Sequence, residues 1–146
     1  MVIETKELGL VEIKEQEIIN FSHAIYGFEG ATRFSLLSDK TKPNNPFMWL
    51  QCVDKKDPCF AVIDPYSLFT DYDPILSEED KQAIDLSSEQ YLRYLVIATV
   101  PKNIRDLSLN LKCPIAINSE KNIAMQVILE NSNYSMRYTI FNRVEG

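Results

Sequence analysis

Three aspartates, Asp64, Asp71 and Asp73, lie close together in the chain and form its best candidate for a catalytic group. Paired carboxylates can act together as general acid and general base. Asp64 and Asp73 each precede a proline, however, and aspartate at that position commonly begins a turn or caps a short helix. We therefore expect structural roles for these side chains, and hydrolase activity from this cluster is the least favoured function.

His23 is the only histidine, and no GxSxG elbow supplies a serine nucleophile that it might activate. The three cysteines, Cys52, Cys59 and Cys113, have no CxxC spacing, and a zinc site normally needs several Cys or His ligands at short spacing. Cys52 and Cys59 lie on successive predicted strands and could face each other, but we expect reduced thiols. P-loop and GxGxxG motifs are also missing. The sequence therefore predicts a protein that is not an enzyme and needs no cofactor or metal.

Negative charge is concentrated in one part of this 146-residue chain, whose net charge is −6. Residues 71–90 contain seven acids against Lys81 alone, whereas residues 91–146 contain four acids and seven bases. An acidic surface repels a phosphate backbone and attracts a basic partner, so direct nucleic-acid binding is disfavoured. The longest apolar run, residues 95–100, is far shorter than the ~20 residues that span a bilayer. The N-terminus has no secretory signal pattern, so we expect a cytoplasmic protein without a membrane partner.

Short segments rich in β-branched and aromatic residues predict strands along most of the chain. They cover residues 2–5, 8–13, 17–21, 33–37, 47–53, 59–63, 91–100, 115–118 and 123–129. Helical signal is confined to residues 78–84, where Ser77 and Asp80 form a capping-box pattern, and to one turn at 65–69 that Asp64 can cap. This pattern predicts one mainly β domain over residues 1–146, a barrel or a compact sandwich with one or two short helices.

Five blocks of sequence follow one another from about residue 21 to residue 137. They are IYGFE at 25–29 with FSLL at 34–37, PFMWLQCVD at 46–54, FAVIDP at 60–65 with DYDP at 71–74, the strand end at 96–101, and NLKCPIAIN at 110–118 with QVIL at 126–129. In this order and at this spacing they resemble the family of the flagellar assembly factor FliW. Cys52 and Cys113 stand where the family often has serine and alanine, and residues 107–109 also depart from its pattern.

The resemblance implies a small antiparallel β-barrel with short helices and a function in flagellar assembly. Members of the family bind the RNA-binding translational regulator CsrA and also bind flagellin. Free FliW sequesters CsrA, which allows flagellin mRNA to be translated, and accumulating flagellin captures FliW so that repression returns. The expected function is therefore a switch between two protein partners, flagellin and CsrA, and not a chemical reaction.

Two stretches are candidates for partner binding. Residues 71–90 combine acids with aromatic side chains, although they could equally form a solvated cap whose aromatics plug one end of the barrel. Residues 131–143 combine tyrosines with arginine, although they could simply form a last strand. The candidate partner-binding residues are Phe69, Asp71, Tyr72, Asp73, Glu78, Glu79, Asp80, Tyr134, Arg137 and Tyr138. The alternative function is a small-molecule-binding barrel, which a filled barrel interior would oppose.

Overall fold

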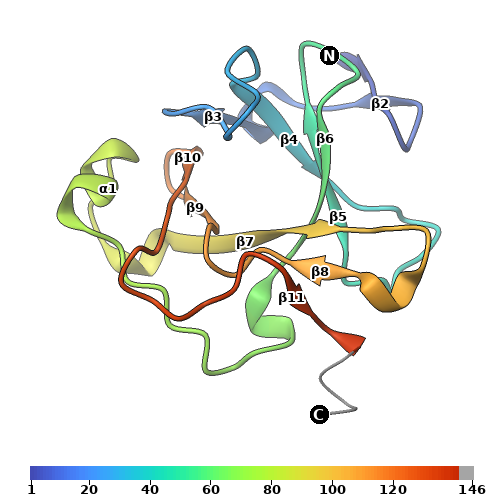
Figure 1. The fold of residues 1–146 in the computed structure, drawn as a ribbon. Helices are drawn as coiled ribbons and strands as arrows, with labels where there is room; N and C mark the ends of the chain where they lie inside the picture. Colours follow the sequence, from blue (N-terminus) through green and yellow to red (C-terminus); the bar gives the residue numbers. More distant parts are fainter. Residues whose placement is uncertain (142–146) are drawn as a thin grey trace.

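The computed structural model describes residues 1–141, and Figure 1 shows how their helices and strands are arranged. The strands are β1 Val2–Glu4, β2 Leu10–Glu12, β3 Ile18–Phe21, β4 Arg33–Leu37, β5 Met48–Cys52, β6 Cys59–Ile63, β7 Leu92–Thr99, β8 Ser108–Leu109, β9 Ile115–Asn118, β10 Ile123–Gln126 and β11 Tyr138–Thr139. The α-helix α1 spans Glu78–Ala83, and single 3-10 turns lie at Glu15–Glu17, Pro65–Ser67, Glu89–Tyr91 and Ile104–Asp106. No helix within residues 1–141 is long and apolar enough to cross a membrane.

Seven strands close into a barrel in the order β7-β6-β5-β4-β3-β10-β9, because β9 returns to pair with the first half of β7. The other end of β7 pairs with β8, and β8 in turn carries β11. Neighbouring strands are antiparallel, as the family resemblance implies, except at one seam. There β3 and β10 run parallel and are joined by two residue pairs, Asn20 with Ile123 and Phe21 with Ala124. The prediction of a small antiparallel β-barrel is confirmed, with this one parallel seam added.

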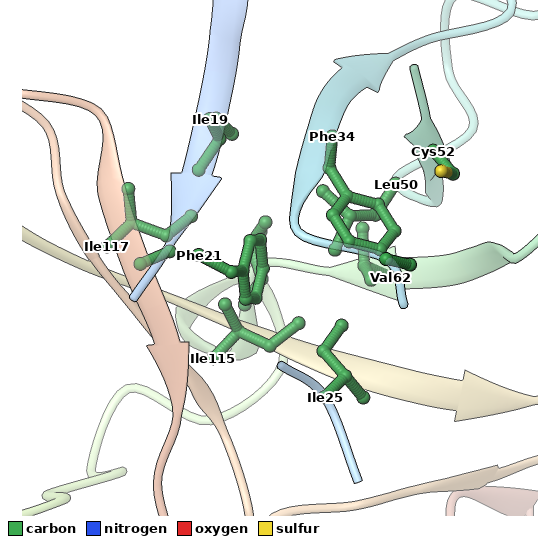
Figure 2. Packing of buried hydrophobic residues seen from close by; sticks show 12 residues of the cluster. Ile19, Phe21, Ile25, Phe34, Leu50, Cys52, Val62, Ile115 and Ile117 are labelled. Carbon is green, nitrogen blue, oxygen red and sulfur yellow. The ribbon is translucent and has the colours of Figure 1, made fainter. Parts of the chain in front are cut away.

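Apolar side chains that alternate along the strands fill the barrel interior. Figure 2 shows side chains from β3, β4, β5, β6 and β9 converging on one another, with Phe34, Leu50, Val62 and Ile115 all fully buried. The rings of Phe21 and Phe34 pack with their centroids 5.0 Å apart. Burial of these side chains is the main source of stability in such a fold. An interior packed with these side chains opposes the small-molecule-binding alternative.

The β1–β2 hairpin closes one side of the barrel with a second, smaller apolar cluster. Ile3, Ile13 and Val53 are buried in it, and Trp49 is partly buried against them. Trp49 therefore belongs to the core rather than to an exposed binding surface, as its apolar neighbours in the sequence suggest.

The two predicted helical segments both form, and each begins at the predicted cap. The Ser77 hydroxyl accepts the N–H of Asp80 at the start of α1, and the Asp64 carboxylate accepts the N–H of Tyr66 at the start of the 3-10 turn. The chain leaves α1 through Asp85, whose φ of 53° is the left-handed conformation common just after a helix. Local capping chemistry therefore fixes both segments.

The structure differs from the predicted strands in two details. Gln51 pairs with Cys59 across β5 and β6, so Cys52 and Cys59 lie on opposite faces of these strands and cannot form the pair that we considered. All three cysteines are free thiols. The predicted strand 123–129 ends as a regular strand at Gln126, but its backbone pairing with residues 112–114 continues to Leu129.

Residues 131–143 were expected either to dock a partner or to form a last strand. Within them, Tyr138–Thr139 forms the strand β11. Tyr138 pairs with Leu109 of β8, and its ring meets the ring of Phe69 edge-on at a centroid distance of 5.2 Å. Arg143, at the end of the predicted stretch, lies outside the described residues.

Candidate functional site

A groove of about 920 Å³ opens on the outside of the barrel beside the β3–β10 seam. Three segments far apart in the sequence form its walls, namely residues 23–29, 73–80 and 125–134. In Figure 1 the helix α1 and the chain that leaves β10 lie next to each other on the left of the molecule, at the groove. We call this feature the acidic groove because of the side chains described below.

The first wall is an extended segment in which alternate side chains point in opposite directions. Tyr72, Pro74 and Leu76 are buried, whereas Asp73, Ile75 and Ser77 face outward, and Asp73, Ile75 and Ser77 line the groove. This two-residue period is that of a strand. It places Ile75 on the surface with 78% of its area exposed, although it is one of the most apolar residues in the segment.

Tyr72 anchors this wall to the barrel. Its ring is only 4% exposed and packs against Tyr134 at a centroid distance of 4.8 Å, and its hydroxyl donates to the carbonyl of Leu111 at 2.7 Å. Burial raises the pKa of Tyr72 well above its ordinary value, so the phenol stays protonated. The Tyr134 hydroxyl in turn accepts the backbone N–H of Asp73 at 2.8 Å. These contacts hold the segment that carries Asp73 and Ile75 in a fixed position against the barrel.

The helix α1 continues the same wall and brings Glu79 and Asp80 to the groove. Its C-terminal end is held by Asn118, a fully buried side chain on β9. The Asn118 amide donates to the carbonyls of Ile84 and Asp85, both at 3.0 Å, and its side-chain oxygen accepts the N–H of Glu120 at 3.1 Å. A helix of this length is not stable by itself, so these contacts determine where its acidic residues lie.

The opposite wall is β10 with its continuation to residue 132. Val127 and Leu129 are buried and donate their N–H groups to the carbonyls of Pro114 and Lys112, both at 2.9 Å. Ile128 and Glu130 alternate with them and are exposed along the groove. Each wall therefore presents one exposed isoleucine with an acidic side chain two residues away, Ile75 with Asp73 and Ile128 with Glu130.

The loop at residues 23–29 closes one end of the groove. Ile25 is buried in the barrel core, while Tyr26 next to it is 74% exposed. Gly27 follows with a φ of 86°, a conformation that favours glycine and that turns the chain sharply after Tyr26. The side-chain oxygen of Gln126 accepts the N–H of Tyr26 at 3.3 Å, which ties this loop to the opposite wall.

The groove is acidic because five of its lining side chains are carboxylates and, among the described residues, none is lysine or arginine. The five are Glu29, Asp73, Glu79, Asp80 and Glu130. Lys81, the nearest base along α1, instead pairs with Glu89 at 3.0 Å and with Glu78 at 3.4 Å. Such a surface, with Tyr26, Ile75 and Ile128 exposed between the charges, suits a partner that is both basic and apolar.

The structure brings four of the ten predicted site residues together in this groove, namely Asp73, Glu79, Asp80 and Tyr134. Asp71, Glu78 and Arg137 are exposed outside its lining, while Phe69 and Tyr138 pack on each other beside the core. Tyr72 is buried, so its ring is not exposed as an aromatic anchor and instead follows the alternative in which the aromatics of this segment pack against the barrel. Tyr72 and Phe69 instead attach the acidic segment to the barrel.

The aspartates first considered for catalysis are separated by role. The Asp64 carboxylate accepts the N–H of Tyr66 at 2.9 Å and so caps its 3-10 turn. Asp73 lines the acidic groove, whereas Asp64 does not. Within the described part of the chain, no group of three or more His, Cys, Asp or Glu side chains is arranged to hold a metal ion.

Several groove residues were missed by the sequence analysis. Tyr26 and Glu29 belong to one of the blocks that carry the family resemblance and were not named as binding candidates, although an aromatic residue beside a glycine was a usable signal. Exposure of Ile75 could also have been predicted, because an alternation that buries Tyr72 and Leu76 places Ile75 on the other face. Ile128 and Glu130 carried no such signal, since only the tertiary structure shows that one edge of their segment is open.

Comparisons with known proteins agree with this fold. A family model described as "FliW protein" matches residues 2–140. The chain is 35% identical over 145 residues to a protein of Ruminiclostridium cellulolyticum named flagellar assembly factor FliW, covering 99% of this chain and 97% of the relative. It is 36% identical over 145 residues to a protein of the same name from Syntrophus aciditrophicus, covering 99% and 90%.

A solved structure is also similar along its whole length. The crystal structure of a flagellar assembly factor FliW superposes with a TM-score of 0.88 at 35% sequence identity, covering 97% of each chain. The family model, the identity to these relatives and the similar crystal structure together lead to one assignment: this chain belongs to the FliW family of flagellar assembly factors.

Proposed function

We propose that this protein binds and antagonises the translational regulator CsrA and also binds flagellin, so that flagellin synthesis is coupled to flagellar assembly by an exchange of partners. It acts by occupying surfaces of other proteins and catalyses no reaction. Because translation takes place in the cytoplasm, that is where we propose it works. The observation that carries the proposal is the acidic groove, in which two segments predicted as binding surfaces meet.

Charge supports the choice of CsrA as one partner. A protein that grips RNA needs basic side chains where it contacts the phosphates. Asp73, Glu79 and Glu130 come from different segments of this chain and surround one concave surface. Opposite charge across an interface speeds association and gives specificity, and the same negative field disfavours RNA. The protein therefore offers CsrA a surface that RNA avoids.

The contiguity of the surface supports competition between the two partners. The acidic segment and the C-terminal segment are joined by the hydrogen bond from the Asp73 N–H to the Tyr134 hydroxyl and by the Tyr72–Tyr134 ring contact. A partner that covers one segment would cover or displace part of the other. Two proteins that each need this surface could not bind at full strength together, and exchange follows from that overlap.

Charge reversal in the groove tests the proposal. Glu79→Lys combined with Glu130→Lys changes both walls, and calorimetry with CsrA should show affinity reduced by about tenfold or more at low salt. The matched control combines Glu12→Lys with Glu15→Lys, an equal change in charge at exposed positions near β2, which Figure 1 shows well away from α1. The control should stay within about twofold of the unmodified protein, because distant charges are screened. Equal loss of affinity in both variants, or in neither, would remove the groove from the proposal.

A further inference from the structure

We propose that the acidic groove receives its partner as an added β-strand, an extended protein segment with basic and aliphatic side chains whose backbone carbonyls accept the unpartnered N–H groups of Gln126 and Ile128. This inference deepens the proposed function and depends on it for the choice of a protein as occupant. It specifies how the occupant binds and which atoms of this chain hold it.

The free edge arises where the barrel seam splits. The last bond between the two strands is the Ser22 N–H to the Ala124 carbonyl, at 2.9 Å, after which the chain turns away toward Tyr26. The other strand does not end there, because Val127 and Leu129 still pair with Pro114 and Lys112. One edge of residues 126–129 is therefore occupied by the strand beside it, while the other edge has lost its neighbour.

The register shows which backbone groups face the opening. In an antiparallel pair, the N–H and C=O of alternate residues point to opposite sides. Since the N–H groups of Val127 and Leu129 point toward residues 112–114, those of Gln126 and Ile128 point the other way, into the groove. Within residues 1–141, neither of these two N–H groups has a backbone acceptor, whereas the Ile128 carbonyl already accepts the N–H of Glu130 at 3.1 Å, so the edge offers an incoming strand its two donors. An open strand edge is a template for pairing with another chain.

The side chains around this edge select the occupant. A strand laid along it would place alternate side chains toward the groove walls, with successive residues about 3.3 Å apart. Ile128 and Ile75, exposed by 40% and 78%, offer apolar contacts to aliphatic side chains. The carboxylates of Asp73 and Glu130 would pair with lysine or arginine side chains of the added strand that lie two residues from its aliphatic side chains. A groove of about 920 Å³ lies at the upper end of the size range for ligand sites and suits a short peptide segment.

One substitution separates backbone pairing from the other contacts. Ile128→Pro removes the N–H that faces the groove and leaves the N–H groups of Val127 and Leu129 paired with their strand. Proline is tolerated at an edge position whose N–H is not used in the sheet. The matched control is Ile128→Val, which keeps the N–H and a β-branched apolar side chain.

The binding experiment uses a capped six-residue peptide of alternating lysine and valine, together with purified CsrA and flagellin. For each of these probes that binds the unmodified protein, the Pro variant should bind about threefold to tenfold more weakly than the Val variant. A difference of this size is the effect of one lost main-chain hydrogen bond. A peptide with glutamate in place of lysine should not bind. Equal affinity of the Pro and Val variants for every binding probe would overturn the inference, as would binding of none of the probes.

A second measurement needs no substitution and stands even if the Pro variant does not fold. Amide hydrogen exchange of the unmodified protein should slow at Gln126 and Ile128 when a probe is bound, while Val127 and Leu129 are protected in the free protein already. Unchanged exchange at Ile128 in a saturated complex would also overturn the inference.

The outcomes separate this inference from the proposed function. If CsrA binds and the Pro and Val variants do not differ, the partner assignment stands and the added strand is wrong. If neither CsrA nor flagellin binds but the lysine–valine peptide binds in a Pro-sensitive way, the added strand is right and the partner assignment is wrong.

Discussion

Replacing Asn118 by alanine should loosen α1 from the barrel and destabilise the whole protein. Asn118 is fully buried and makes three hydrogen bonds, two donated to the carbonyls of Ile84 and Asp85 and one accepted from the N–H of Glu120. Each such bond contributes about 0.5–1.5 kcal/mol net, and the carbonyl of the fully buried Ile84 would be left without this donor. The expected loss is therefore about 3 kcal/mol of the free energy of unfolding.

Urea unfolding followed by far-UV circular dichroism measures this loss, and thermal unfolding should show a midpoint lowered by roughly 10 °C for a domain of this size. Asn133→Ala, at an exposed position, is the control and should change stability by less than about 0.5 kcal/mol. CsrA affinity should fall with Asn118→Ala as well, since Glu79 and Asp80 lose their fixed position. A loss of stability below about 1 kcal/mol would refute the reasoning that Asn118 holds α1 in place.

Asn118→Asp sharpens the same test. The aspartate keeps the shape of the side chain and the acceptor for Glu120, but places a carboxylate against the carbonyls of Ile84 and Asp85. Burial and the facing oxygens would raise the pKa of this carboxyl in the folded protein above its unfolded value of about 3.9. Its protonated form is then the favoured one, so the variant should be most stable below about pH 4 and should lose stability as pH rises through the folded pKa. The same stability at pH 4 and pH 7, relative to the unmodified protein, would contradict this account.

Three further predictions follow from individual contacts. Tyr72→Phe should cost about 1 kcal/mol of unfolding free energy by removing the bond to the Leu111 carbonyl, and should leave CsrA affinity nearly unchanged because the ring keeps the packing on Tyr134 that positions the groove wall. Lys81→Ala should barely alter the melting temperature, since its ion pairs involve the exposed Glu78 and Glu89, but should strengthen low-salt CsrA binding in calorimetry by making the surface more negative. Burial raises the pKa of Cys59 to about 11, so alkylation of this thiol at pH 8 should be roughly a hundredfold slower than that of an ordinary cysteine, as mass spectrometry would record.

The fold could be predicted largely because its signals are local. The strands β4 to β7 follow from short runs of apolar residues that include aromatic or β-branched side chains, and α1 follows from the cap at Ser77. Most of the antiparallel pairs, β3–β4, β4–β5, β5–β6, β6–β7 and β9–β10, join strands that follow one another in the chain, so their pairing is the simplest one available. The parallel seam is different, because Phe21 and Ala124 lie about a hundred residues apart and no local pattern sets their register.

The groove could be predicted only in part, for the same physical reason. Composition shows that residues 71–90 are acidic, and the structure places Asp73, Glu79 and Asp80 together as that suggests. The facing wall comes from a distant segment, and its open edge exists only because β3 leaves the seam early. Tyr72 was a candidate for partner binding because aromatic residues beside acids resemble an interface, whereas its contact with Tyr134 is available only once the chain has folded.

Competition between the two proposed partners tests the central claim most directly. The purified protein is titrated into CsrA by calorimetry at two salt concentrations, and the titration is repeated after saturation with flagellin monomer. The account predicts binding to CsrA that weakens as salt increases and disappears when flagellin is bound. Stable binding of CsrA to the flagellin-saturated protein, or binding of neither partner at either salt concentration, would contradict it.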